Sequence, residues 1–174
     1  MPKLAELQAC TGCGACVDAC AAKAIAFVED ADGFVRPQVD AARCKSCGSC
    51  TRACPALQAD HAVPVANGTR ESDFFAARLR DATLLGEVSS GGAFWALARA
   101  TIARGGVVYG AVQTEVGHVR HVRAETLEEA KALRRSKYLP SDVRGCYAAV
   151  RQDLLAGREV LFSGTGCQVA ALNA

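Results

Sequence analysis

The chain has 174 residues, of which 51% are hydrophobic and 22% charged, with a formal net charge of +2. These values are typical of globular proteins and argue against a disordered chain. Residues 1–64 carry 6 basic and 7 acidic side chains and residues 65–174 carry 14 and 11, so neither part has the basic excess of a nucleic-acid-binding protein. The most apolar stretch, around residues 93–113, is interrupted by charges and glycines, so we expect a soluble cytoplasmic protein without a membrane span.

Eight of the ten cysteines lie within the first 54 residues and form an internal repeat with an offset of 34. Each copy reads C-x-x-C-G-x-C-x-x-x-C, which is the spacing of the bacterial ferredoxin motif. Because a reducing compartment disfavours disulfides, we interpret these cysteines as metal ligands or redox groups. The copies are Cys10, Cys13, Cys16 and Cys20, and Cys44, Cys47, Cys50 and Cys54.

This spacing predicts two 4Fe-4S clusters that exchange their fourth ligands. Three thiolates three residues apart suit a tight loop around one face of a cubane, and the glycine after the second cysteine permits positive φ there. The fourth cysteine lies on the next helical turn, and in two-cluster ferredoxins it binds the other cluster. We therefore assign Cys10, Cys13, Cys16 and Cys54 to cluster 1, and Cys44, Cys47, Cys50 and Cys20 to cluster 2.

Structural zinc and disulfides are the alternatives to iron–sulfur clusters. Zinc takes four ligands, typically as two separated C-x-x-C pairs, and two identical runs of four cysteines fit that pattern poorly. Pro55 follows Cys54, as the motif expects, whereas Ala21 follows Cys20 and weakens only the stop of a short helix. We also expect backbone N–H groups of the loops to point at the sulfurs and offset their negative charge.

Between the cysteine runs, apolar residues 24–28 and 34–37 flank the turn signal Asp32-Gly33, which predicts a β-hairpin. With two short cysteine-bearing helices, this hairpin makes a ferredoxin-like module over residues 1–58 that the clusters would hold together. Residues 59–72 contain polar and helix-breaking residues, and we interpret them as a linker.

Residues 73–174 alternate between predicted strands and helices, which indicates an α/β segment. Thr126 and Glu129 form a capping-box signal at the start of one helix. The predicted strands are 73–79, 107–112, 118–122 and 159–163, and the predicted helices are 93–104, 126–137, 143–155 and the residues after Gly166. The expected fold class is therefore α+β, with a ferredoxin-like dicluster module followed by an incomplete α/β domain.

Two loops of this segment have residues that could bind a ligand or react with one. The loop of residues 89–92 precedes a helix, where N–H groups and the positive end of the helix dipole can hold a phosphate; an ordinary turn and N-cap is the alternative. The loop of residues 164–167 joins a strand to a helix, where the dipole favours the Cys167 thiolate. A small buried residue is the alternative for Cys167.

These stretches together resemble the β-subunit family of coenzyme F-420 (deazaflavin) hydrogenases and dehydrogenases. The resemblance rests on residues 89–94, 136–138 and 164–172, in that order behind a ferredoxin module. The family usually has proline where Gly166 stands, and its members continue well beyond this motif, whereas the chain ends six residues after Gln168. A fragment, one piece of a split gene and a degenerate protein are the alternatives for this early end.

Members of the family are iron–sulfur flavoproteins that usually carry FAD, so the resemblance implies part of an FAD-dependent oxidoreductase. It would relay electrons between a redox partner protein and a deazaflavin or similar two-electron acceptor. The implied flavin-site residues are Ser90, Gly91, Gly92, Lys137, Tyr138, Gly164 and Thr165, with Cys167 as the candidate catalytic residue or extra cluster ligand. A ferredoxin-like carrier without flavin and a structural iron–sulfur protein are the alternatives.

The remaining polar residues are interpreted without a chemical role. His118 and His121 fall on a strand that we expect to be exposed, and Cys146 is interpreted as a packing residue. Lys137 can also be a solvated cation near a helix C-terminus. The pairs Arg120/Arg123 and Arg134/Arg135 are interpreted as a solvated face, with docking to an acidic redox partner as the alternative. The missing C-terminal half is a second candidate partner, and no nucleic acid is expected.

Overall fold

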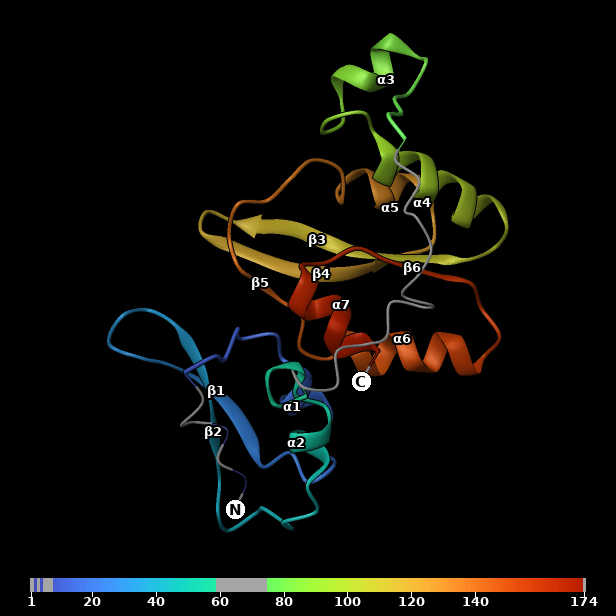
Figure 1. Cartoon of the computed structure of the whole chain (residues 1–174). Coiled ribbons are helices and arrows are strands. Elements are labelled where there is room, and N and C mark those ends of the chain that lie inside the picture. Colours follow the sequence, from blue (N-terminus) through green and yellow to red (C-terminus); the bar gives the residue numbers. More distant parts are fainter. Residues whose placement is uncertain (1, 3, 5–7, 59–74, 174) are drawn as a thin grey trace. The chain divides into compact units, whose positions relative to one another are not determined.

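The computed structural model describes residues 2, 4, 8–58 and 75–173 and divides the chain into two compact units (Figure 1). Unit 1 comprises Met1–Gly68 together with Thr165–Ala174, and unit 2 comprises Thr69–Gly164. The predicted linker, residues 59–72, lies outside the described residues. The predicted domain boundaries stay a prediction, although residues 165–174, expected in the second domain, group with the first unit.

Unit 1 combines a hairpin with short helices. Strands β1 (Ile25–Glu29) and β2 (Val35–Val39) pair antiparallel, which confirms the hairpin predicted around Asp32-Gly33. Helix α1 packs against β1 and α2, and helix α7 packs against α1 and η1. The helices are α1 (Ala15–Asp18), α2 (Ser49–Arg52), the 3-10 helix η1 (Pro55–Leu57) and α7 (Gly166–Leu172).

Two candidate ligands belong to a small buried cluster among the described residues of unit 1. Leu4, Cys16, Ile25 and Cys50 form one buried cluster, against which Phe27 and other partly buried residues pack. A module of this size buries little apolar surface, so a bound metal adds stability that the apolar contacts alone do not supply. The fold of unit 1 and the occupation of its cysteines are therefore coupled.

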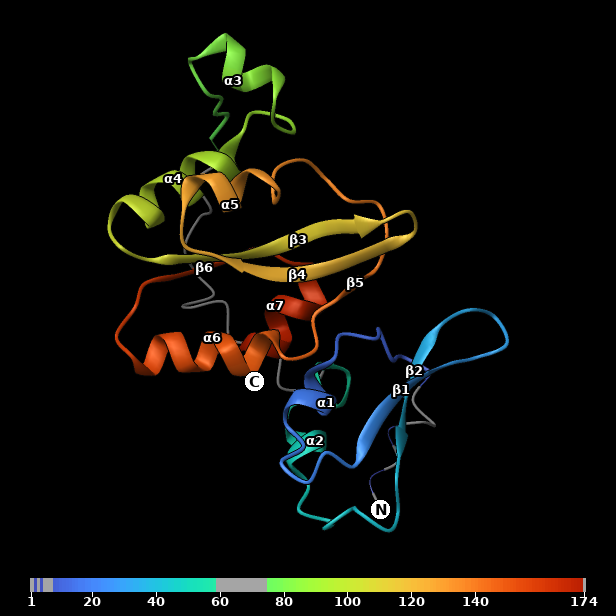
Figure 2. The same ribbon diagram turned by 180° about the vertical axis from the view of Figure 1, so that it is seen from behind.

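Unit 2 is a mixed four-stranded sheet with helices on both faces (Figures 1 and 2). The strand order is β5-β4-β3-β6, with β3 and β4 antiparallel and the pairs β3–β6 and β4–β5 parallel. Helices α4 and α5 cover one face and α6 the other. The elements are α3 (Ala82–Gly86), α4 (Ala93–Ala103), β3 (Val107–Glu115), β4 (His118–Ala124), α5 (Leu127–Lys131), β5 (Ser141–Asp142), α6 (Cys146–Leu155) and β6 (Val160–Phe162).

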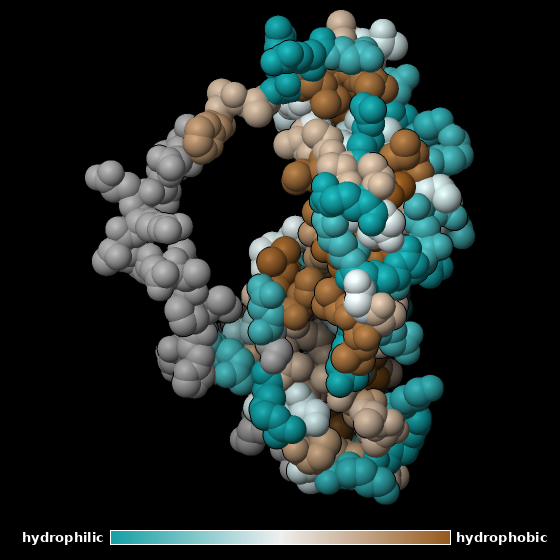
Figure 3. Space-filling model, turned by 90° about the vertical axis from the view of Figure 1, so that its right-hand side faces the viewer, coloured by the Kyte–Doolittle hydropathy of each residue, from teal (hydrophilic) through white to brown (hydrophobic). Residues whose placement is uncertain are grey.

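Apolar residues of α4, β3 and α5 make the core of unit 2. Trp95 and Ala98 pack on Val108 with Ala130 and Leu133, and all five side chains are buried. The β-branched run at the start of β3 is therefore the buried strand that its sequence predicts. On the face shown in Figure 3, hydrophilic and apolar side chains are interspersed. No helix in the described ranges has the length and apolar character needed to cross a membrane.

Three sequence predictions for unit 2 need correction. Residues 75–79, the described part of a predicted strand, form no strand, because the Leu79 N–H donates to the Gly91 carbonyl of a loop, at 2.9 Å. Helix α5 begins with the predicted capping box but ends at Lys131 rather than near 137, and Arg135 adopts a positive φ of 68°. His121, expected on an exposed strand, is 6% exposed.

A buried polar network joins β3, β4 and α6. The Asp153 carboxylate accepts a hydrogen bond from the Tyr109 hydroxyl at 2.5 Å and two from the Arg123 guanidinium at 2.7 and 2.8 Å. Hydrogen bonds from Arg123 lower the pKa of Asp153 to about 2, and burial raises the pKa of Tyr109. Arg123 is therefore part of a structural ion pair rather than of a solvated face.

Replacing Asp153 by asparagine should lower the free energy of unfolding of unit 2 by about 2 kcal/mol at pH 7, because Arg123 loses a bidentate partner. The folded-state pKa lies below the ordinary 3.8, so this contribution is complete above about pH 4 and is lost as the pH falls towards 2. Urea denaturation followed by the fluorescence of Trp95, the sole tryptophan, measures it. The loss of unfolding free energy in the Asp153→Asn variant should be equal at pH 7 and pH 5. Glu128→Gln is the control: it breaks an exposed pair with Lys131 and should change the free energy of unfolding by less than about 0.5 kcal/mol.

Candidate metal centre

The four cysteines predicted for cluster 1 line one pocket of unit 1. They come from two distant stretches, because Cys10, Cys13 and Cys16 belong to the first loop and α1 whereas Cys54 follows α2. Phe27 of β1 and Pro55 of η1 supply apolar walls. The structure thus brings Cys54, the last cysteine of the second run, to the first run.

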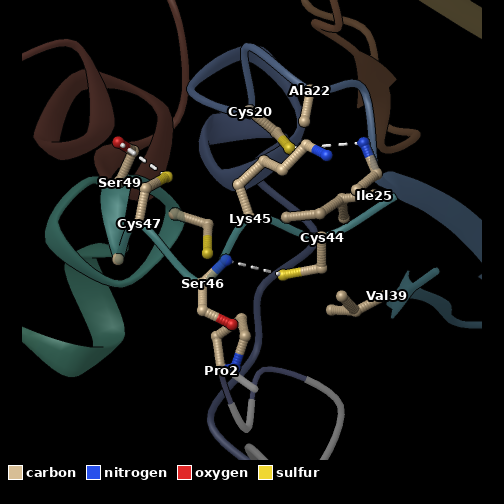
Figure 4. Close-up of a pocket in the computed structure, with 13 residues that line it drawn as sticks. Pro2, Cys20, Ala22, Ile25, Val39, Cys44, Lys45, Ser46, Cys47 and Ser49 are labelled. Atoms are coloured by element: carbon tan, nitrogen blue, oxygen red, sulfur yellow. Dashed lines mark hydrogen bonds between the residues drawn. The ribbon is translucent and has the colours of Figure 1, made fainter. Parts of the chain in front are cut away.

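The four cysteines predicted for cluster 2 line a second pocket (Figure 4). Cys44, Cys47 and Cys50 lie on the second loop and the start of α2, and Cys20 reaches the same pocket from the end of the first run. Ile25 and Val39 of the hairpin provide its apolar side. Each pocket is therefore lined by three cysteines of one run and the fourth cysteine of the other.

Glycine geometry at the start of α1 and α2 positions these loops. Gly14 and Gly48 are the N-cap residues of the two helices, with φ of 79° and 74°, which confirms the positive φ predicted after each second cysteine. Each helix is a single turn and ends two residues before the fourth cysteine of its run. Cys20 and Cys54 therefore lie outside the loop that holds the other three cysteines. After Cys54, Pro55 begins the 3-10 helix η1.

Polar hydrogens surround the sulfurs of the second pocket. The Ala24 N–H donates to the Cys20 Sγ at 3.3 Å and the Ser46 N–H donates to the Cys44 Sγ at 3.4 Å (Figure 4). The Cys47 Sγ and the Ser49 Oγ lie 3.4 Å apart and hydrogen bond. The expected N–H···S contacts are confirmed for this set, and they stabilise negative charge on sulfur.

Burial opposes ionisation of the deeper thiols. It raises the pKa of Cys16 to about 12, and it is the main cause of a raised pKa at Cys13, to which Cys167 also contributes. Hydrogen bonds from Ser49 lower the pKa of the exposed Cys47. A thiolate at Cys16 needs a nearby cation to offset its lost hydration, and a bound iron would supply that positive charge. The donor set therefore suits a metal with soft sulfur ligands.

The sulfurs surround pockets rather than converge on a point. Among the described residues, no three Cys, His, Asp or Glu side chains are arranged to hold a single metal ion. Each pocket nevertheless has four cysteines on its wall. Four thiolates around a space suit a cubane, whose iron atoms each take one thiolate.

The structure brings together two of the three stretches implied for a flavin site. The Ser136 N–H donates to the Ser89 hydroxyl at 2.8 Å, so the loop of residues 89–92 lies beside residues 136–138 within unit 2. Arg134 pairs with the Glu87 carboxylate at 2.6 Å, which ties the same two segments. Gly164 ends unit 2, whereas Thr165 belongs to unit 1 and caps α7 with Gln168.

Each of these candidates also has a structural explanation. A Cβ on Gly91 would lie 2.2 Å from the Ala77 carbonyl oxygen, and Gly92 caps α4 with a φ of 78°. The Lys137 ammonium donates to the Ala132 carbonyl at 3.0 Å and to the Arg134 carbonyl at 2.6 Å, just after α5, and burial lowers its pKa. Ser90 and Tyr138 are exposed. The role of these residues in flavin binding stays a prediction.

Cys167 lies at the start of a helix, as predicted, but in unit 1 rather than in the second domain. It belongs to α7 in unit 1, its Sγ lies 3.1 Å from the Thr165 Oγ, and it acts electrostatically on Cys13. Its position in the sequence gives no signal for this, because α7 meets α1 only through the tertiary fold. Cys146 is the first residue of α6 and buried, which agrees with packing. The buried His121 ring hydrogen bonds to the Ser163 carbonyl at 2.9 Å through Nε2, and its Nδ1 has no hydrogen-bond partner among the described residues.

Comparison with protein families identifies the cysteine region. Two family models, each described as a 4Fe-4S dicluster domain, match residues 9–57 and residues 36–121. The second match contains only the second cysteine run, since the sequence has no cysteine between Cys54 and Cys146. A comparison with curated proteins finds none that matches. The matches support an iron–sulfur electron-transfer role.

Replacing Gly91 by alanine should destabilise unit 2 by about 1–3 kcal/mol, because the new Cβ overlaps the Ala77 carbonyl and pushes residues 75–79 off the loop. Gly86 is the matched control, since a Cβ there has nothing within 4 Å. Gly86→Ala should leave stability unchanged or raise it by up to about 1 kcal/mol. Equal urea midpoints for the two variants, read by Trp95 fluorescence, would contradict the close packing.

Proposed function

We propose that the chain is an iron–sulfur electron-transfer protein that holds two 4Fe-4S clusters in the two pockets of unit 1. The observation that carries this proposal is the reciprocal exchange, in which each pocket is lined by three cysteines of one run and the fourth cysteine of the other. The dicluster family matches over the same residues support it.

The roles of the residues follow from this arrangement. Cluster 1 is assigned to Cys10, Cys13, Cys16 and Cys54, and cluster 2 to Cys44, Cys47, Cys50 and Cys20. When bound, each cluster supplies one-electron transfer. The chain supplies thiolates, apolar walls that limit solvent, and N–H groups directed at sulfur, all of which set the reduction potential.

The finer proposal is that this chain is part of an FAD-dependent oxidoreductase in a reducing compartment such as the cytoplasm. Its support is the resemblance of three stretches to the deazaflavin hydrogenase and dehydrogenase β-subunits, and the Ser89–Ser136 bond that joins two of them. FAD converts one-electron into two-electron chemistry, and a deazaflavin or similar acceptor fits that role. A ferredoxin-like carrier without flavin is the second candidate, favoured by the structural explanations of Gly91 and Lys137.

The exchanged ligands predict a specific pattern of iron loss. After anaerobic reconstitution, the full chain should contain about eight iron atoms and about eight acid-labile sulfides. The double variant Cys50→Ala/Cys20→Ala removes two ligands of one cluster and should keep about four iron atoms. Cys50→Ala/Cys54→Ala removes one ligand of each cluster and should lose nearly all iron. The electron paramagnetic resonance signal after dithionite reduction should follow the same order.

The reverse order of the two double variants would mean that each run binds its own cluster. Cys146→Ala is the control, because Cys146 lies in unit 2, and it should retain the wild-type iron content. Zinc instead of iron and sulfide in the wild type would refute the electron-transfer proposal itself.

The flavin proposal predicts that the full chain, reconstituted with iron and dialysed against FAD, retains about one FAD per chain. Ser89→Ala, which breaks the contact with Ser136, should weaken this binding about tenfold because the two loops separate. Fluorescence of FAD released by denaturation measures the content. Full iron content without retained FAD would instead support the carrier without flavin.

A further inference from the structure

The two copies of the cysteine run differ in charge. Residues 9–18 carry one acidic and no basic side chain, and residues 43–52 carry three basic and no acidic side chain. The net charge of these two ten-residue segments is therefore −1 and +3. The first run is also contacted by Arg36, which donates to the Cys10 carbonyl at 2.8 Å and is paired with Asp30. The basic residues of the second run are Arg43, Lys45 and Arg52, at positions where the first run has Ala9, Thr11 and Asp18.

The copies also differ in exposure. Cys47 is exposed whereas its counterpart Cys13 is half-buried, and Cys47 is the one exposed cysteine among the ten, all of which the structure describes. Gly14 and Ala15 are buried, whereas the corresponding Gly48 and Ser49 are half-buried. At its second cysteine and the two residues that follow, the second run is therefore more exposed than the first.

Helix α7 packs beside the first run. It packs against α1 and against η1, the elements that flank the first pocket, and its Cys167 acts electrostatically on Cys13. Helix α7 therefore lies beside α1, which carries Cys16 of the first run.

The three cations lie on and beside the second cysteine loop in defined positions. Arg52 donates to the Cys47 carbonyl at 3.3 Å and to the Ser49 hydroxyl at 3.2 Å, which holds its guanidinium beside the loop. Lys45 lies on the wall of the second pocket (Figure 4), and Arg43 reaches the Ala22 carbonyl at 3.5 Å. All three residues are exposed, and we call them the basic rim. The Asp40 carboxylate, which accepts from the Ala42 N–H, is the nearby opposite charge on the same loop.

We propose that the basic rim docks an acidic one-electron carrier protein, so that electrons are exchanged with this carrier at the second pocket. The inference rests on the proposed iron–sulfur function. Complementary charge steers association and fixes orientation, and the rim would bring the acidic face of the carrier over Cys47. In each encounter the reduced carrier loses one electron and the chain gains one, and no bond is made or broken.

The test is the rate at which a reduced acidic plant-type 2Fe-2S ferredoxin reduces the reconstituted full chain, followed by stopped-flow absorbance. Arg43→Glu/Lys45→Glu reverses two rim charges and leaves the anchored Arg52 in place. At about 20 mM ionic strength we expect the second-order rate constant to fall at least tenfold. At about 0.5 M salt, where charges are screened, the variant and the wild type should agree within about twofold.

Two controls separate docking from damage. Arg99→Glu/Arg151→Glu makes the same change in net charge at exposed positions of unit 2 and should change the rate constant by less than about twofold. Reduction by the methyl viologen radical cation should become faster, or stay unchanged, in the rim variant, because the rim then attracts a cation. Calorimetric titration with oxidised ferredoxin should show the same loss of affinity as the kinetics.

An unchanged ferredoxin rate in the rim variant would overturn the docking proposal, as would an equal loss of rate with ferredoxin and viologen. Tighter binding of a single-stranded RNA than of ferredoxin would overturn it as well. In each case, iron content and the dithionite-reduced resonance signal show whether the clusters are intact. Absent clusters would refute the proposed function, whereas intact clusters with an unchanged ferredoxin rate would refute only the docking site.

Discussion

The exchange of the fourth cysteine is the constraint on which the rest of unit 1 depends. Because Cys54 lines the pocket of the first run and Cys20 that of the second, each proposed cluster ties together both halves of an internal repeat. The apolar core alone is small, and two of its four buried members are cysteines. Two of the proposed ligands, Cys16 and Cys50, are thus also packing residues, so a change at either would affect both the proposed redox site and the fold.

Local sequence patterns predicted the elements that local interactions determine. The hairpin at Asp32-Gly33, the capping box of Thr126 and Glu129 and the left-handed Gly14 and Gly48 depend on residues within a few positions of one another. The spacing of the cysteines also identified the members of each pocket, because the ferredoxin motif fixes which thiols share a loop.

Sequence failed where a distant segment decides the structure. Residues 75–79 look like a strand, but the N–H of Leu79 is taken by the Gly91 carbonyl. His121 alternates with exposed residues, yet its ring stacks on Phe162 of another strand, at 5.3 Å between centroids. The position of Cys167 near Cys13 follows from the packing of α7 on α1, and no spacing within either segment signals it.

Unit 1 is discontinuous in the chain, since it contains residues from both ends and unit 2 is inserted between them. Helix α7 is therefore synthesised after the whole of unit 2, although it packs on the first helix. The contact between α1 and α7 can therefore form only after the whole of unit 2 has been synthesised. Completion of unit 1 thus waits for a segment that lies about 150 residues downstream of its first helix.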